Sequence, residues 1–315
     1  MIVPALLVAL AAAALPPPAA AASSGDAIAV PPPTPVVREV RYRLSAAVRP
    51  LLIFWIRAEN IGGARVLWRS GNDGRRGYEM LLGSDPRRAP RKINRWGWER
   101  EDMGPEGALL AGVMRKTDED SLAEARTNVA QEGQGGYIFK SIRSRLAGGE
   151  VHATNTLFRV TKDYGYHDLA EVLSLVDSNA IGPPRVREGR VAGDTQPGFL
   201  FAVSTLIDQA VAAATSSPRQ LLSSRALAFT FNAYLYDVRL RSTEWLDSAR
   251  FASRSYRNLV RIEFEHYNRE KKTRERFTLD CGTEGDIRGV PVHVQYQPKW
   301  WIRIEGVVDD GEVFP

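Results

Sequence analysis

The sequence predicts an α+β protein that is mostly antiparallel β, with barrel-like or half-barrel-like sheets and about three helices. Three observations support this fold class. Short segments of alternating polarity follow one another along the chain, as strands do. Turn sequences join most of them, which favours antiparallel pairing, and the strand–helix–strand rhythm of a parallel sheet is absent. The 315 residues are 44% hydrophobic and 25% charged, so the chain is large enough for an ample core.

The N-terminus is typical of a secretory signal. Ile2–Leu15 is an apolar run, shorter than the roughly 20 residues that a transmembrane helix needs. The small residues at Ala20–Ala22 predict cleavage near Ala22, although no Lys or Arg precedes the apolar run. We therefore expect a signal peptide over residues 1–22, a Pro/Ala-rich leader over 23–36, and a periplasmic or secreted protein. The alternative is an apolar N-terminal tail of low complexity.

Residues 37–180 are predicted to form an N-terminal β-rich domain with two helices. Gly62 and Gly63 predict a turn, and the run from Ser70 to Gly74 is a strong hairpin signal. The predicted strands are Val37–Val48, Leu51–Arg57, Ala64–Arg69, Gly77–Leu82, Ala108–Met114, Tyr137–Leu146 and Val151–Val160. The predicted helices are Thr117–Glu132 and Asp168–Asn179, each with a capping residue and an apolar stripe.

Residues 181–198 are rich in Gly, Pro and charge, and predict a linker to a second domain over 199–315. That domain begins with a helix, Phe199–Ala214, whose apolar residues cluster on one side. An antiparallel, barrel-like set of strands is expected to follow. The predicted strands are Leu227–Phe231, Leu235–Leu246, Asn258–Tyr267, Arg274–Cys281, Val290–Gln297 and Trp300–Asp309.

The loop after Gly77–Leu82 is the strongest candidate for a binding site. It carries six basic residues and two prolines, and the sequence predicts that it closes on an Asn-Arg-Trp-Gly-Trp turn. Guanidinium groups bind phosphate or carboxylate through paired hydrogen bonds, and indoles suit a membrane interface or a sugar ring. The candidate ligand-binding residues are Arg87, Arg88, Arg91, Lys92, Arg95, Trp96 and Trp98. The alternative is a solvated loop whose tryptophans pack back on the sheet.

No catalytic residue, metal site or cofactor is predicted. The four histidines lack metal-binding spacing, and the sequence contains none of the common hydrolase or nucleotide-binding motifs. Cys281 is the only cysteine, so no disulfide can form within the chain. His293 lies one predicted strand away and could serve as a base for a cysteine nucleophile, but a structural thiol is the favoured interpretation.

The strand–turn–strand sequence RFTLDCGTEGDIRGVPVHVQY, followed by Trp301–Glu305, resembles the end of the DUF3108-like periplasmic proteins. This resemblance implies an antiparallel β-barrel or half-barrel fold without an established enzymatic activity, and it transfers no functional residues. The N-terminal half resembles uncharacterised exported bacterial proteins.

The sequence therefore favours an exported, non-catalytic protein that binds an amphiphilic or anionic cell-envelope component, a lipid or a glycan. An apolar cavity with a basic rim would suit such a ligand. Peripheral contact with a membrane fits the basic loop, whereas no nucleic-acid partner is expected for an exported protein. The alternatives are an envelope hydrolase acting on glycan or lipid, and a structural or interaction protein of the envelope.

Overall fold

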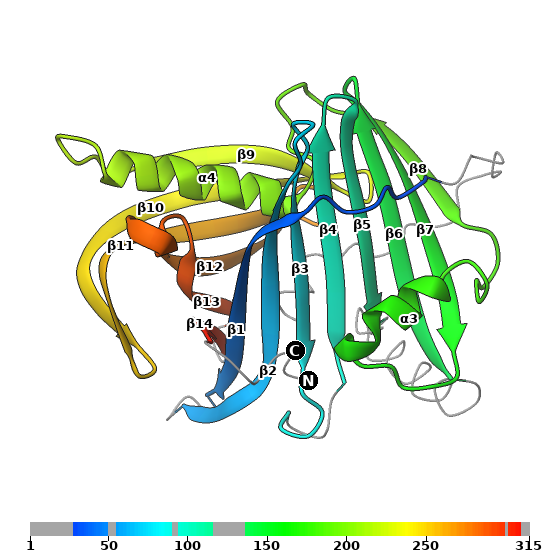
Figure 1. Ribbon diagram of the computed structural model, residues 1–315, viewed down its shortest axis with the longest axis horizontal. Coiled ribbons are helices and arrows are strands. Elements are labelled where there is room, and N and C mark those ends of the chain that lie inside the picture. The colour runs from blue at the N-terminus through cyan, green and yellow to red at the C-terminus, as the bar shows by residue number, and fades with distance from the viewer. Residues whose placement is uncertain (1–27, 50–54, 90–93, 116–135, 300–301, 310–315) are drawn as a thin grey trace.

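One strongly curved antiparallel sheet of 14 strands organises the structure (Figure 1). The computed structural model describes residues 28–49, 55–89, 94–115, 136–299 and 302–309. Strands pair in chain order from β1 to β8 and from β9 to β14. The two runs meet where β1 (Val36–Val48) pairs with β14 (Ile302–Val308). The edges are β8 (Arg185–Arg190) and β9 (Ser223–Phe231), so the sheet is not closed.

The mostly antiparallel β architecture is thus confirmed, with one sheet where several were expected. The other strands are β2 (Ile56–Ser70), β3 (Arg76–Ser84), β4 (Trp96–Gly104), β5 (Gly107–Arg115), β6 (Tyr137–Ala147), β7 (Glu150–Val160), β10 (Tyr234–Phe251), β11 (Arg254–Asn268), β12 (Thr273–Gly282) and β13 (Pro291–Lys299). Two α-helices, α3 (Leu169–Ser174) and α4 (Phe199–Ala214), occur within the described residues, where about three were predicted. The predicted helix Thr117–Glu132 and the predicted signal peptide lie outside these residues.

Two local predictions, a turn and the length of a helix, are corrected, and a strand is found within the predicted linker. Gly62 and Gly63 continue β2 instead of turning, because they pair with β3 so closely that a Cβ on Gly62 would lie 2.1 Å from the carbonyl oxygen of Gly83. The predicted linker 181–198 contains β8, which pairs with β7. The predicted helix Asp168–Asn179 is reduced to α3, which follows the short 3-10 helix η3 (Tyr166–Asp168).

Helix α4 supplies the core of the concave face, and its bounds match the prediction. It contacts β3 and the strands β9 to β12. Its buried side chains, among them Ala202, Leu206 and Val211, join apolar residues from both arms of the sheet, including Ile142 and Phe264. The helix therefore fills the inside of the curve. None of the helices among the described residues has both the length and the apolar character to cross a membrane.

The convex face carries a second core beneath α3 and η3. Trp96 and Trp98 of β4 lie there with Phe139 of β6 and Phe158 of β7. The N-terminal segment from residue 28 crosses the outside of the sheet in an extended path (Figure 1). Two arginines hold it: the buried Arg100 donates to the carbonyl of Pro31 at 2.6 Å, and the half-buried Arg69 donates to the carbonyl of Thr34 at 2.7 Å.

Candidate functional site

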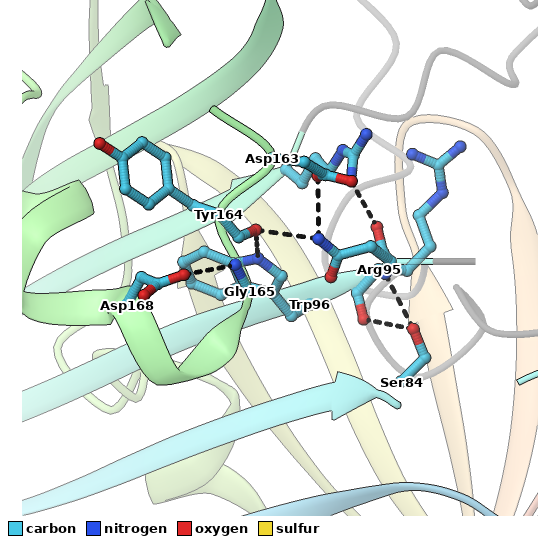
Figure 2. Close-up of polar contacts among 9 residues, drawn as sticks. Ser84, Arg95, Trp96, Asp163, Tyr164, Gly165 and Asp168 are labelled. Carbon is cyan, nitrogen blue, oxygen red and sulfur yellow. Dashed lines mark hydrogen bonds and ion pairs between the residues drawn. The ribbon is translucent and has the colours of Figure 1, made fainter. Parts of the chain in front are cut away.

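The basic loop leaves the sheet at Ser84 and returns at Arg95, and these two residues tie its ends together. The backbone N–H of Ser84 donates to the carbonyl of Arg95 at 2.8 Å, and the N–H of Arg95 donates to the Ser84 hydroxyl at 2.8 Å (Figure 2). Inside the loop, Asp85 accepts from the N–H of Arg87 through its side chain and from that of Ala89 through its carbonyl. The base of the loop is therefore fixed.

A second set of contacts fixes the returning side of the loop to the segment that precedes η3 (Figure 2). The side-chain amide of Asn94 donates to Asp163 at 2.9 Å and to the carbonyl of Tyr164 at 3.0 Å. That carbonyl also accepts from the indole N–H of Trp96 at 2.8 Å. Arg115 donates to both Asp163 and the carbonyl of Asn94, so β5 is part of the same network.

The five predicted ligand-binding residues that the structure describes do not form one surface. Trp96 and Trp98 are buried within the sheet, where the indole N–H of Trp98 donates to Glu79 at 2.9 Å. The predicted Trp-Gly-Trp turn is instead the start of β4, because its alternating side chains enter the convex core. Arg87 and Arg88 are exposed, and Arg95 is half-buried. Arg91 and Lys92 lie outside the described residues.

Two buried acids on the opposite face of β4 were missed by the sequence reasoning. Glu99 and Glu101 both point into the concave core. The carboxylate of Glu101 accepts from the backbone N–H groups of Leu200 at 2.7 Å and Phe201 at 2.9 Å, at the start of α4. Strand spacing could have found this pair, since residues i and i+2 share a face.

A hydrogen bond between the two carboxyl groups favours the protonated form of Glu99 and the ionised form of Glu101. Burial and the neighbouring Glu101 raise the pKa of Glu99 well above its usual range. Burial also raises the pKa of Glu101 to about 7, although the hydrogen bonds from Leu200 and Phe201 oppose the shift. Paired carboxyls can act as acid and base, but these two are buried, and Glu101 holds the N-terminus of α4, which is a structural use of its carboxylate.

A buried cluster on the convex face joins β11, β12 and β13. Asp280 accepts from Arg261 at 2.7 Å and lies 2.7 Å from Nδ1 of His293, whose ring stacks on Phe251. Burial opposes ionisation of Asp280, but hydrogen bonds from His293 and Arg261 outweigh it and lower the pKa of that carboxyl. Among the described residues no group of three or more His, Cys, Asp and Glu side chains is placed to hold a metal ion.

Cys281 is not part of this cluster. It belongs to the concave core, whereas its neighbour Asp280 faces His293 on the other side of the sheet. Burial raises the pKa of the Cys281 thiol well above its usual range. A thiolate nucleophile next to His293 is therefore inconsistent with the structure, and the structural interpretation of this thiol fits its position.

Comparisons with known proteins add one distant likeness. No protein-family model and no curated protein matches the chain. The resemblance to DUF3108-like proteins therefore stays an expectation. A solved structure described as a beta-barrel-like protein of the domain of unknown function DUF1849, from Brucella abortus, is similar over 88% of this chain and 98% of that chain, with 7% identity and a TM-score of 0.45. No conclusion about function follows from a likeness at this level.

Proposed function

We propose that the protein is a non-catalytic binding protein for an anionic component of the cell envelope, a lipid head group or an acidic glycan. The observation that carries this proposal is the contrast within the basic loop. Its base is held by backbone and side-chain hydrogen bonds, while Arg87 and Arg88 are exposed. Cations on an anchored loop lose less conformational entropy when they bind an anion than cations on a free chain do.

Binding at the surface fits the structure better than binding in an interior cavity. Helix α4 occupies the concave face with side chains that include Ala202 and Leu206, both 0% exposed. An amphiphile inside the sheet would have to displace this helix. The ligand contact is therefore proposed for the loop, with the arginines supplying charge and paired donors. A periplasmic or secreted location is part of this proposal, because envelope components are found there.

Vesicle co-sedimentation tests the proposal. Vesicles of phosphatidylglycerol and phosphatidylcholine represent the lipid source, and an acidic oligosaccharide in isothermal titration calorimetry represents the glycan source. Changing Arg87 and Arg88 together to Ala removes two charges, and each basic residue near an anionic surface contributes about 1 kcal/mol. We therefore expect roughly 30-fold weaker binding to phosphatidylglycerol vesicles or to the oligosaccharide.

The matched control removes two arginines from the edge strand β8, as Arg185→Ala with Arg190→Ala. Both residues are exposed, so the total charge falls equally while the loop is intact. This control is expected to retain most of the binding. Equal weakening in the two double variants would mean nonspecific charge attraction and would contradict the proposal, as would the absence of binding to both ligands.

A further inference from the structure

An arginine-rich surface on the convex side of β10, β11 and β12 is independent of the basic loop. Glu265 of β11 pairs with Arg239 of β10 on one side and with Arg276 of β12 on the other. Its chain neighbours Phe264 and His266 are on the concave side, among the aromatic residues of the core. The register therefore places these charged side chains together on the outer face of the longest hairpin of the sheet.

Glu265 is surrounded by three arginines without a close hydrogen bond to any of them. Its carboxylate oxygens lie 3.9 Å from Arg239, 3.6 Å from Arg241 and 4.0 Å from Arg276. Its side chain is 1% exposed, and Oε1 is buried without a hydrogen-bond partner. The carboxylate therefore balances charge but leaves the guanidinium donors largely unused. Arg241 and Arg276 remain open to solvent, with side chains 49% and 74% exposed.

Tyr267 orders two guanidinium groups beside this cluster. The guanidinium carbon of Arg239 lies 5.1 Å from the centre of the Tyr267 ring, and that of Arg274 lies 5.4 Å from it. Stacking on an aromatic ring holds a guanidinium in place while leaving its edge donors free. Arg274 and Arg276 are two residues apart on one face of β12, so they lie about 7 Å apart along the strand.

The charge of the surface is strongly unbalanced. Arg269 also belongs to it, and its guanidinium pairs with Asp237. Five arginines share this face with the carboxylates of Asp237 and Glu265. Glu263, which accepts from the Ser242 hydroxyl, lies two residues from Glu265 on the same face of β11, so two positive charges are in excess. An excess of this size on a few strand positions attracts anions and costs folding energy through repulsion. An anionic ligand would neutralise this excess positive charge and would accept hydrogen bonds from the guanidinium groups that Glu265 does not engage.

We propose that this surface binds a phosphate-bearing anion, with Arg241, Arg274 and Arg276 as its direct donors. A phosphate offers several acceptor oxygens and up to two charges, which suits convergent guanidinium forks better than a single carboxylate does. Glu265 offsets part of the arginine charge and lowers the affinity for an anion by its own charge. Tyr267 positions Arg239 and Arg274. The phosphate can belong to a soluble molecule or to a lipid head group.

Isothermal titration calorimetry with inorganic pyrophosphate, and co-sedimentation with phosphatidylglycerol vesicles, test the two sources. Changing Arg241 and Arg276 together to Gln is expected to weaken binding to at least one probe by roughly tenfold or more. Glu265→Gln is expected to strengthen it, because a repelling charge is removed while the size of the side chain is kept.

Arg185→Gln with Arg190→Gln is the matched control, and Arg87→Ala with Arg88→Ala separates this surface from the loop. Both are expected to retain binding to pyrophosphate.

Weaker pyrophosphate binding with unchanged vesicle binding in the Arg241 and Arg276 double variant would identify a soluble phosphate source. Weaker vesicle binding in that variant would support a lipid head group at this surface. If the Arg241 and Arg276 double variant does not fold by circular dichroism, Arg274→Gln serves in its place, since this arginine is exposed and its guanidinium lies over the Tyr267 ring. The proposal is wrong if neither probe binds the wild-type protein. It is also wrong if the Arg241 and Arg276 double variant, or Arg274→Gln in its place, binds both probes as tightly as the Arg185 and Arg190 control does.

Discussion

Gly198 lies against the carboxyl group of Glu101, so that a Cβ added to residue 198 would be 2.2 Å from the carboxyl carbon. The backbone of Gly198 is extended, with φ of −164°, and any residue can adopt that conformation. The requirement for glycine is therefore one of space. The carboxylate of Glu101 must reach past residue 198 to accept from the N–H groups at the start of α4.

Gly198→Ala is expected to lower the free energy of unfolding by about 2 kcal/mol, because overpacking displaces Glu101 from the helix terminus. Urea unfolding followed by circular dichroism measures it. Gly193→Ala is the matched control, since a Cβ there meets nothing within 4 Å, and a change within about 0.5 kcal/mol is expected. Equal stability of the two variants would show that the contact between Gly198 and Glu101 is not tight in solution.

Glu99→Gln tests the protonation of the buried pair. The folded pKa of Glu99 lies well above 4.5, so the folded state keeps a proton that the unfolded chain loses as pH rises through 4.5. Stability contributed by this group is therefore present in full below pH 4.5 and is lost with rising pH, by at most about 1.4 kcal/mol per pH unit. Glutamine keeps a donor toward Glu101 but binds no proton, so this loss should disappear.

The expected result is a variant more stable than the wild type at pH 8, with the difference shrinking toward pH 4.5. Urea unfolding at several pH values measures it. Glu106→Gln changes an exposed acid in the turn after β4 and should follow the wild-type profile. Parallel profiles for Glu99→Gln and the wild type would mean that Glu99 is ionised in the folded protein.

Asp280→Asn tests the cluster with Arg261 and His293 by its behaviour in acid. Removing the charge of a buried, paired carboxylate is expected to cost about 3 kcal/mol at pH 7. Because the folded pKa of Asp280 is lowered, its contribution is present above the unfolded pKa of about 3.9 and is lost as pH falls through the folded pKa. The difference in the free energy of unfolding between wild type and Asp280→Asn should therefore become smaller below about pH 4.

Acid titration of the two proteins by tryptophan fluorescence measures this gap, with Asp194→Asn as the exposed control. A gap that stays constant down to pH 2 would show that the cost comes from packing and not from the charge of Asp280.

Local periodicity in the sequence predicted those elements whose apolar pattern and end residues lie within the element itself. Helix α4 has a continuous apolar stripe and clear ends, and the hairpin of β6 and β7 turns on two glycines in the left-handed region, Gly148 and Gly149. The pairing of β1 with β14 could not be predicted in this way. It joins residues such as Tyr42 and Val308, which are far apart in the chain, and the sequence around each residue does not indicate which strand it pairs with.

The candidate site was predicted less well because residue type does not show which side of a strand is covered. Trp96 and Trp98 suggested ligand binding as part of a loop, but η3 and α3 cover that side of β4. Gly62 suggested a turn, but the close approach of β3 requires the glycine. The buried pair Glu99 and Glu101 was not predicted, because the partner of Glu101 is the start of α4, about 100 residues further along the chain.

Trp96→Phe separates the structural role of this residue from ligand binding. The change keeps a large ring in the convex core but removes the donor to the carbonyl of Tyr164. The carbonyl keeps the hydrogen bond from Asn94, so the loss is that of one hydrogen bond, about 0.5–1.5 kcal/mol, and thermal unfolding should occur at a lower temperature. Binding of phosphatidylglycerol vesicles well below that temperature should not change, because the indole is 1% exposed and cannot contact a ligand.

Arg87→Ala with Arg88→Ala should show the reverse pattern, with weaker binding and unchanged stability. Loss of vesicle binding by folded Trp96→Phe would show instead that the network around Asn94 and Tyr164 sets the shape of the loop that the ligand meets.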